Sequence, residues 1–75
     1  MNVGEKESKA MVVANGKSQE IRLPCTITEF LAGRGLKPTQ VVVEYNGEAL
    51  LREQFGRVQL KNGDRLEVVL PVAGG

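Results

Sequence analysis

The group with the clearest chemical potential lies at the end of the chain. The last residues are Pro71, Val72, Ala73, Gly74 and Gly75. A terminal carboxylate has a pKa of about 3.3–3.7, so it is ionised at neutral pH and can attack an activated phosphorus atom. Glycine has no Cβ, which allows such a segment to enter a narrow active site in conformations closed to other residues. We therefore interpret residues 71–75 as a flexible tail that presents the carboxylate of Gly75.

The remaining reactive side chains do not suggest a catalytic or metal site. Histidine, the commonest general base near neutral pH and the commonest metal ligand, is absent. Cys25 is the single cysteine, and we expect a buried structural thiol because one cysteine without histidine holds no zinc or iron–sulfur site. Glu44 and Glu67 could pair as catalytic carboxylates, but their alternation along predicted strands favours solvent-facing positions. We expect no bound metal and no catalytic residue in the chain itself.

Size and charge exclude further classes of function. Seventy-five residues with 41% hydrophobic content allow one small domain. Ten basic and nine acidic residues leave a net charge of +1, which provides no attraction for nucleic acid or for a membrane surface. No apolar run approaches the ~20 residues of a membrane span, and residues 1–9 are polar and contain no signal sequence. We expect a cytoplasmic protein in which residues 1–9 form a flexible leader.

Local signals predict a hairpin followed by a helix. A turn signal, Asn-Gly at 15–16, separates an apolar run at 11–14 from an alternating segment at 19–23. Thr26 and Glu29 have the spacing of a capping box, which predicts the start of a helix of two to three turns. The expected buried face of this helix consists of Ile27, Phe30 and Leu31.

The second half of the chain predicts strands. A β-branched run at 41–46 is the clearest of them, and an alternating run at 65–70 is another. Between them we expect a short edge strand at 49–51 and an irregular or 3₁₀ turn at 52–55. The order of elements predicts an α+β fold, in which one helix packs across one face of a mixed sheet of about four to five strands and the last strand lies beside the first. The residues of the last strand that would face the core are Leu66, Val68 and Leu70.

The opposite face of the sheet would carry the strand residues of the other parity. We place Val42 and Val69 there, with Val12 or Ala14 as further candidates. Small exposed valines are ordinary strand formers, so one interpretation gives them no role. The other makes this face a docking surface for a partner that receives the tail.

Several motifs resemble the thiamine-biosynthesis sulfur carrier protein family. They are Asn46-Gly47-Glu48, Arg52, Phe55, Leu60, the run Lys-Asn-Gly-Asp-Arg-Leu-Glu-Val-Val at 61–69, and the closing Gly74-Gly75. The resemblance extends from about residue 10 to the end. It implies a ubiquitin-like β-grasp domain at 10–70, which follows the leader and precedes the tail at 71–75.

The resemblance also implies a function. Members of the family act with an E1-like adenylating enzyme, which would use ATP to adenylate the C-terminal glycine, here Gly75. A cysteine desulfurase or sulfurtransferase would then supply sulfur to form a thiocarboxylate, and a thiazole synthase would use that sulfur for the thiazole ring of thiamine. The chain would be a protein co-substrate with no bound cofactor, because ATP, metal and catalytic cysteine belong to the partner enzymes.

Two alternatives share this chemistry. The tail at 71–75 resembles the ending of the molybdopterin synthase small subunit more than the usual ending of a thiamine carrier. A ubiquitin-like modifier, in which activated Gly75 acylates a lysine of another protein, predicts nearly the same sequence features. An interaction module with an incidental Gly-Gly ending is a third interpretation.

Overall fold

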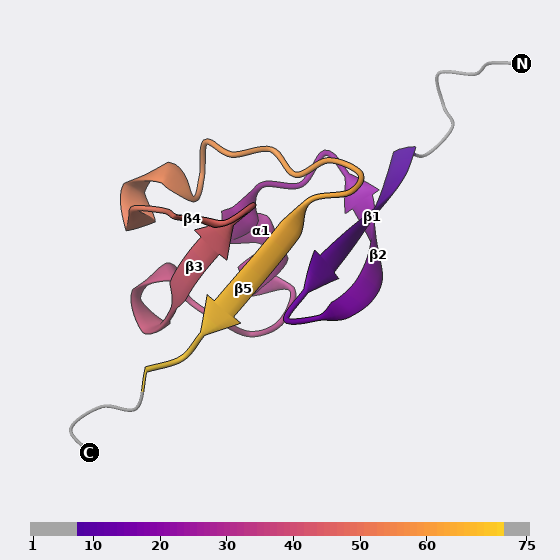
Figure 1. Cartoon of the computed structure of the whole chain (residues 1–75). Coiled ribbons are helices and arrows are strands. Elements are labelled where there is room, and N and C mark those ends of the chain that lie inside the picture. Colours follow the sequence, from indigo (N-terminus) through magenta and orange to yellow (C-terminus); the bar gives the residue numbers. More distant parts are fainter. Residues whose placement is uncertain (1–7, 72–75) are drawn as a thin grey trace, which may run out of the picture.

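The computed structural model describes residues 8–71, which form a mixed sheet and one α-helix (Figure 1). In chain order the elements are β1 (Ser8–Ala14), β2 (Lys17–Leu23), α1 (Ile27–Ala32), η2 (Pro38–Gln40), β3 (Val42–Tyr45), β4 (Glu48–Ala49), η3 (Arg52–Gln54) and β5 (Arg65–Val69). β1 starts two residues before the expected boundary at residue 10, because Ser8 and Lys9 pair with Leu23 and Arg22 across the hairpin. The 3₁₀ helix η2 was not predicted.

The sheet has the strand order β2-β1-β5-β3-β4, with β5 in the middle (Figure 1). β1 and β5 are parallel, and the other neighbouring pairs are antiparallel. The prediction that the last strand lies beside the first is therefore confirmed. A central position satisfies the backbone of β5 from both sides, so the strand that leads to the tail is the best supported strand of the sheet.

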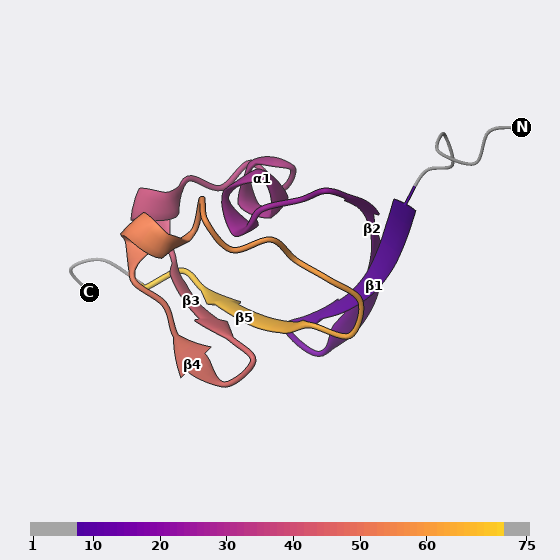
Figure 2. The same cartoon turned by 90° about the horizontal axis from the view of Figure 1, so that it is seen from above.

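The helix α1 covers one face of this sheet (Figure 2). It starts with the predicted capping box, in which Thr26 Oγ1 accepts from the Glu29 N–H at 3.1 Å and Glu29 Oε1 accepts from the Thr26 N–H at 2.9 Å. The helix has six residues, fewer than the two to three turns expected. It ends where Gly35, at φ +74°, turns the chain so that the Leu36 N–H donates to the Leu31 carbonyl at 2.9 Å.

The core fills the space between α1 and the sheet. It consists of Val12, Ala14, Ile27, Phe30, Leu31, Val41, Val43, Phe55, Leu60 and Leu66. The placement of Val12 or Ala14 on the open face was wrong. Ala14 lies beside Leu66 in the parallel pairing of β1 with β5, and paired residues of neighbouring strands share a face, so Ala14 and Val12 face the helix.

The expectation that Leu70 joins the core was also wrong, since its side chain is 52% exposed. The predicted parity of β5 holds for Leu66, which is buried, and for Val68, which is partly buried against the core. Because α1 is short, no helical turn covers the position of Leu70. The α+β prediction of one helix packed across a mixed sheet is confirmed.

Candidate functional site

The candidate site is the exit of β5, from which the tail leaves the domain. β5 ends at Val69, and Leu70 and Pro71 complete the described residues. The predicted reactive residue Gly75 and the predicted tail residues Val72, Ala73 and Gly74 lie outside the described residues, so their placement remains a prediction. The structure does define how the base of the tail is held.

The β3 side of β5 is held by a regular ladder. Val42 pairs with Val69, and the antiparallel register continues to Tyr45 and Leu66. The last strand residue before the tail is therefore fixed in register by β3.

On its other side β5 pairs first with β1 and, beyond the end of β1, with the side chain of Asn15. The ladder between β1 and β5 ends at Ala14 and Leu66. Beyond it, the Val68 N–H donates to Asn15 Oδ1 at 2.7 Å, and Asn15 Nδ2 donates to the Val68 carbonyl at 3.1 Å. The Asn15 amide thus satisfies both backbone groups of Val68 as a neighbouring strand would. From the sequence Asn15 was interpreted only as a turn residue, and no local signal reveals a contact with a residue 53 positions away.

Replacing Asn15 by glycine is expected to loosen the exit of β5. Asn15 has φ +51°, which glycine also adopts, so Asn15→Gly removes the two side-chain hydrogen bonds without backbone strain. We expect a loss of about 1–2 kcal/mol in the free energy of unfolding and faster hydrogen exchange at the Val68 amide. Urea denaturation and amide exchange measure the two effects. Unchanged exchange at Val68 would contradict the assigned role of Asn15.

The predicted partner face, Val42 and Val69, lies on the side of the sheet that α1 leaves open. Val42 and Val69 are directly paired and are 49% and 53% exposed, so their predicted placement on the bare face is confirmed. Glu44 and Glu67 form the next pair on that face, and both are exposed as expected. The face is therefore apolar near the tail and acidic farther along the strands.

A buried carboxylate fixes the turn that leads into β5. Asp64 is 3% exposed and accepts from the Tyr45 hydroxyl at 2.8 Å, from the Lys61 N–H at 2.9 Å and from Asn46 Nδ2 at 3.2 Å. Lys61 Nζ lies 3.4 Å from Asp64 Oδ1 and donates to the Tyr45 hydroxyl at 3.1 Å. Burial by itself raises the pKa of Asp64, but these hydrogen bonds and the Lys61 charge lower it below its ordinary value.

This Asp64 network ties the start of β5 to the end of β3, and Asn46 Oδ1 also accepts from the Arg65 N–H at 2.8 Å. All polar atoms of the network have partners, so it has the character of a structural cluster. The sequence motif contains Asp64, but its burial follows from contacts between residues 18 and 19 positions apart that no periodicity indicates.

The surroundings of Cys25 do not favour a reactive thiolate. It is half-buried, and its Sγ donates to the Thr26 carbonyl at 3.4 Å. Burial raises the pKa of the Cys25 thiol, and the nearby Glu29 charge adds to this effect, while Arg34 opposes it. A thiol with a raised pKa is less often the reactive thiolate at neutral pH, which agrees with a structural role.

Two properties of residues 8–71 bear on other functions. No group of three or more His, Cys, Asp or Glu side chains in this part of the chain is arranged to hold a metal ion. None of its helices is long and apolar enough to span a membrane.

The chain has a mixed five-stranded sheet with one helix packed against it, and its central strand is followed in sequence by a Gly-Gly ending. This combination defines a ubiquitin-like β-grasp protein. Residues 7–75 match the model of the ThiS family, and the chain belongs to this family. The crystal structure of the thiamine biosynthesis protein ThiS from Geobacter metallireducens is similar, with 32% sequence identity and a TM-score of 0.73. The match covers 87% of this chain and 99% of that protein.

Two curated relatives carry the name thiazole synthase. The protein from Paramagnetospirillum magneticum is 30% identical over 64 residues, which cover 85% of this chain and 20% of the relative. The protein from Magnetococcus marinus is 34% identical over 61 residues, which cover 81% of this chain and 19% of the relative. The chain therefore spans about a fifth of the length of these relatives.

Proposed function

We propose that the carboxylate of Gly75 is adenylated and then converted to a thiocarboxylate, which supplies sulfur for the thiazole ring of thiamine. The observation that carries this proposal is the ThiS family match over residues 7–75, which includes both terminal glycines. The match also favours thiamine biosynthesis over molybdopterin synthesis, the pathway that the tail sequence left open.

The chemistry needs two displacements. The Gly75 carboxylate oxygen attacks the α-phosphorus of ATP, and pyrophosphate leaves. A sulfur nucleophile then attacks the acyl carbon, and AMP leaves with one of the original carboxylate oxygens. Adenylation is necessary because a free carboxylate has no group that sulfur can displace.

The partner enzymes supply the remaining groups in this proposal. An E1-like enzyme binds ATP and activates Gly75, and a cysteine desulfurase or sulfurtransferase provides sulfur. The carrier then needs no bound cofactor of its own, and the raised pKa of Cys25 supports a carrier that does not use its own thiol. We also propose a cytoplasmic location, since the activation consumes ATP and a lone thiol is stable in a reducing compartment.

We propose a thiazole synthase as the protein that consumes the sulfur. The two relatives support this partner, because each is named thiazole synthase and contains a stretch similar to this chain. A carrier segment within the same polypeptide as the synthase has a high effective concentration at its active site.

The face around Val42 and Val69 is the proposed docking surface for these enzymes. Val42→Asp places a charge in an exposed apolar pair next to the tail, so we expect at least about tenfold slower adenylation with little change in stability. Leu51→Asp is the matched control, because Leu51 is 61% exposed and lies outside the strands. Equal rates for the two variants, measured as pyrophosphate release, would remove this face from the proposal.

The proposed modification is tested by intact mass. The full chain is incubated with its activating enzyme, ATP and sulfide, and we expect the mass gain of one oxygen exchanged for one sulfur. A ubiquitin-like modifier gives isopeptide conjugates with lysines of other proteins instead. Conjugates without any thiocarboxylate would overturn the sulfur-carrier proposal.

A further inference from the structure

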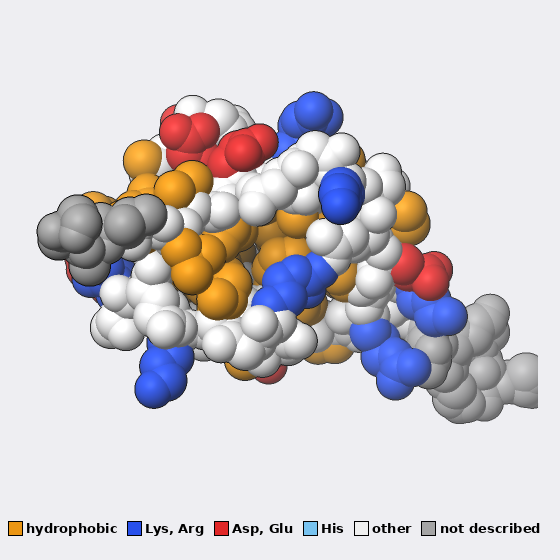
Figure 3. Space-filling view, turned by 90° about the horizontal axis from the view of Figure 1, so that it is seen from below, with side chains coloured by type: hydrophobic (Ala, Val, Ile, Leu, Met, Phe, Trp, Pro, Cys, Tyr) orange, Lys and Arg blue, Asp and Glu red, His pale blue; other side chains and the backbone are white. Residues whose placement is uncertain are grey.

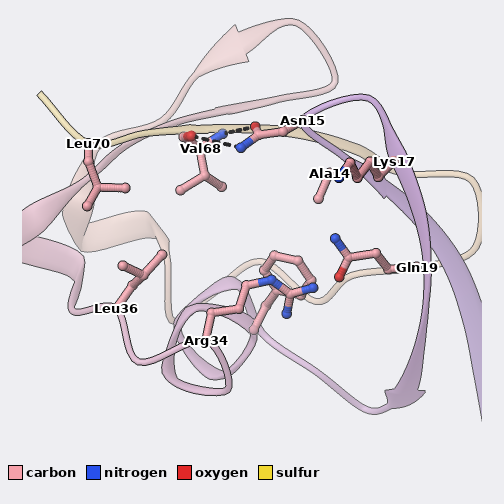
Figure 4. Close-up of a pocket in the computed structure, with 9 residues that line it drawn as sticks. Ala14, Asn15, Lys17, Gln19, Arg34, Leu36, Val68 and Leu70 are labelled. Atoms are coloured by element: carbon pink, nitrogen blue, oxygen red, sulfur yellow. Dashed lines mark hydrogen bonds between the residues drawn. The ribbon is translucent and has the colours of Figure 1, made fainter.

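A hollow of about 280 Å³ lies between α1, the hairpin of β1 and β2, and the outgoing end of β5 (Figure 4). The residues that line it are Ala14, Asn15, Lys17, Gln19, Phe30, Arg34, Leu36, Val68 and Leu70. Figure 4 shows Leu36 and Leu70 at one end, Lys17 and Gln19 at the other, and Arg34 along the helix side. This hollow is on the helix side of the sheet, opposite the face of Val42 and Val69.

The hollow exists because α1 ends before β5 does. The helix stops at Ala32, and Gly35 turns the chain away, so the side chains of Val68 and Leu70 extend past the last helical turn. Leu70 is 52% exposed although its parity directs it to the helix side. The apolar wall of the hollow is therefore left without a covering element among the described residues.

The charge around the hollow has one sign. Arg34 lies over the Phe30 ring, with its guanidinium carbon 3.9 Å from the ring centroid, and Lys17 lies at the far end. None of the lining residues is Asp or Glu. Within residues 8–71, no carboxylate forms an ion pair with Arg34 or Lys17. Figure 3 shows the apolar side chains gathered in a hollow with basic side chains at its border.

The hollow is also continuous with the base of the tail. Leu70, in its wall, immediately precedes Pro71, and Val68 is the residue held by Asn15. An enzyme that takes the tail into its active site must therefore pass close to this hollow. Successive residues of an extended chain point to opposite faces of a sheet. Val69 therefore faces the open side of the sheet, and Leu70 faces the hollow.

We propose that this hollow is an anchor pocket for an acidic peptide segment of the enzyme that receives the tail. One leucine or phenylalanine of that segment enters between Leu36, Val68 and Leu70, and its neighbouring carboxylates pair with Arg34 and Lys17. The volume suits one large side chain and lies just below the range of about 300–1,000 Å³ for small-molecule sites. A buried anchor with charges at its rim is the usual composition of an interface hot spot. The identity of the receiving enzyme rests on the proposed function. The chemistry of the occupant rests only on the residues that line the hollow.

A peptide titration tests the pocket without any enzyme. The full ¹⁵N-labelled chain is titrated with acetyl-Glu-Leu-Phe-Asp-amide and, separately, with acetyl-Lys-Leu-Phe-Lys-amide. We expect saturable, millimolar binding of the acidic peptide only, with shifts confined to the amides of Leu36, Val68 and Leu70 and to the Gln19 side chain. Arg34→Glu and Lys17→Glu should each abolish these shifts, and Arg57→Glu, an exposed arginine outside the hollow, should leave them intact.

Other occupants give other results. Equal shifts with both peptides, or none with either, would overturn the proposal. The same shifts with AMP alone would assign the hollow to a nucleotide, and concentration-dependent shifts without any addition would assign it to a second copy of this chain. Either result also overturns it.

A second measurement uses the enzymes and separates this proposal from the proposed function. The affinities of the wild-type chain, Arg34→Glu, Lys17→Glu and Arg57→Glu are measured for the activating enzyme and for thiazole synthase. We expect at least about tenfold weaker binding to one of them for the two pocket variants only. Wild-type affinities for both variants, together with normal thiocarboxylate formation, would overturn the pocket and leave the function intact. If the wild type forms no thiocarboxylate but the peptide titration is positive, the proposed function is overturned and the pocket is retained.

Discussion

Deletion of Gly75 is expected to abolish thiocarboxylate formation while the domain stays folded. The carboxylate that remains, on Gly74, ends about 3.5 Å short of its position in the full chain. Misplacement of a reacting group by about 1 Å can cost 10²-fold, so we expect adenylation to fall by at least about 10²-fold. The hydrogen bonds that hold β5, from β3, Asn15 and the Asp64 network, all lie within residues 8–71, so the free energy of unfolding should not change.

The matched control is a deletion at the other end of the chain. Removal of residues 1–7 leaves β1 intact from Ser8 and should preserve both folding and thiocarboxylate formation. Pyrophosphate release and intact mass measure the reaction, and thermal unfolding measures stability. If the chain without Gly75 forms thiocarboxylate at the rate of the full chain, the terminal glycine has no chemical role.

Replacement of Asp64 by alanine is expected to have the largest effect on stability. The change leaves the Tyr45 hydroxyl, the Lys61 N–H and the Asn46 amide without the acceptor that they share. Loss of a buried carboxylate with several partners costs about 3 kcal/mol or more, against a total of about 5–15 kcal/mol for a small domain. Tyr45→Phe removes one donor of the network and should cost only about 1 kcal/mol. Urea denaturation of both variants checks this order, and equal effects would contradict the central place of Asp64.

The same carboxylate predicts how stability depends on pH. The pKa of Asp64 is lowered in the folded protein, so its ionised form binds protons less readily there than in the unfolded chain. Its contribution is fully present above the unfolded pKa of about 3.9 and is lost as the pH falls through the lower, folded value. Asp64→Ala should therefore flatten the decline of stability below about pH 4.

Much of the fold could be predicted because its signals are local. The Asn15-Gly16 turn, the capping box of Thr26 and Glu29, and the β-branched run of β3 depend on residues close together in sequence. Helix α1, with six residues, is slightly shorter than the two to three turns expected. The face of Val12 was wrong because it depends on the register between β1 and β5, which two distant strands determine together.

The candidate site was predictable in part for the same reason. The placement of Val42 and Val69 followed from alternation within single strands, and the structure confirms it. Asn15 and Asp64 were missed as supports of β5, because each acts on residues far away in sequence. A short polar side chain near a glycine indicates a turn, but it does not indicate whether that side chain also bonds a residue far away in sequence.

The most direct test of the account follows the sulfur itself. The carrier is converted to its thiocarboxylate with radioactive sulfide, purified, and given to thiazole synthase and its other substrates with no further sulfur source. The account predicts labelled thiazole, with one labelled sulfur transferred for each carrier returned to the carboxylate form. Thiazole that forms without label, while the carrier keeps its labelled sulfur on Gly75, would contradict it.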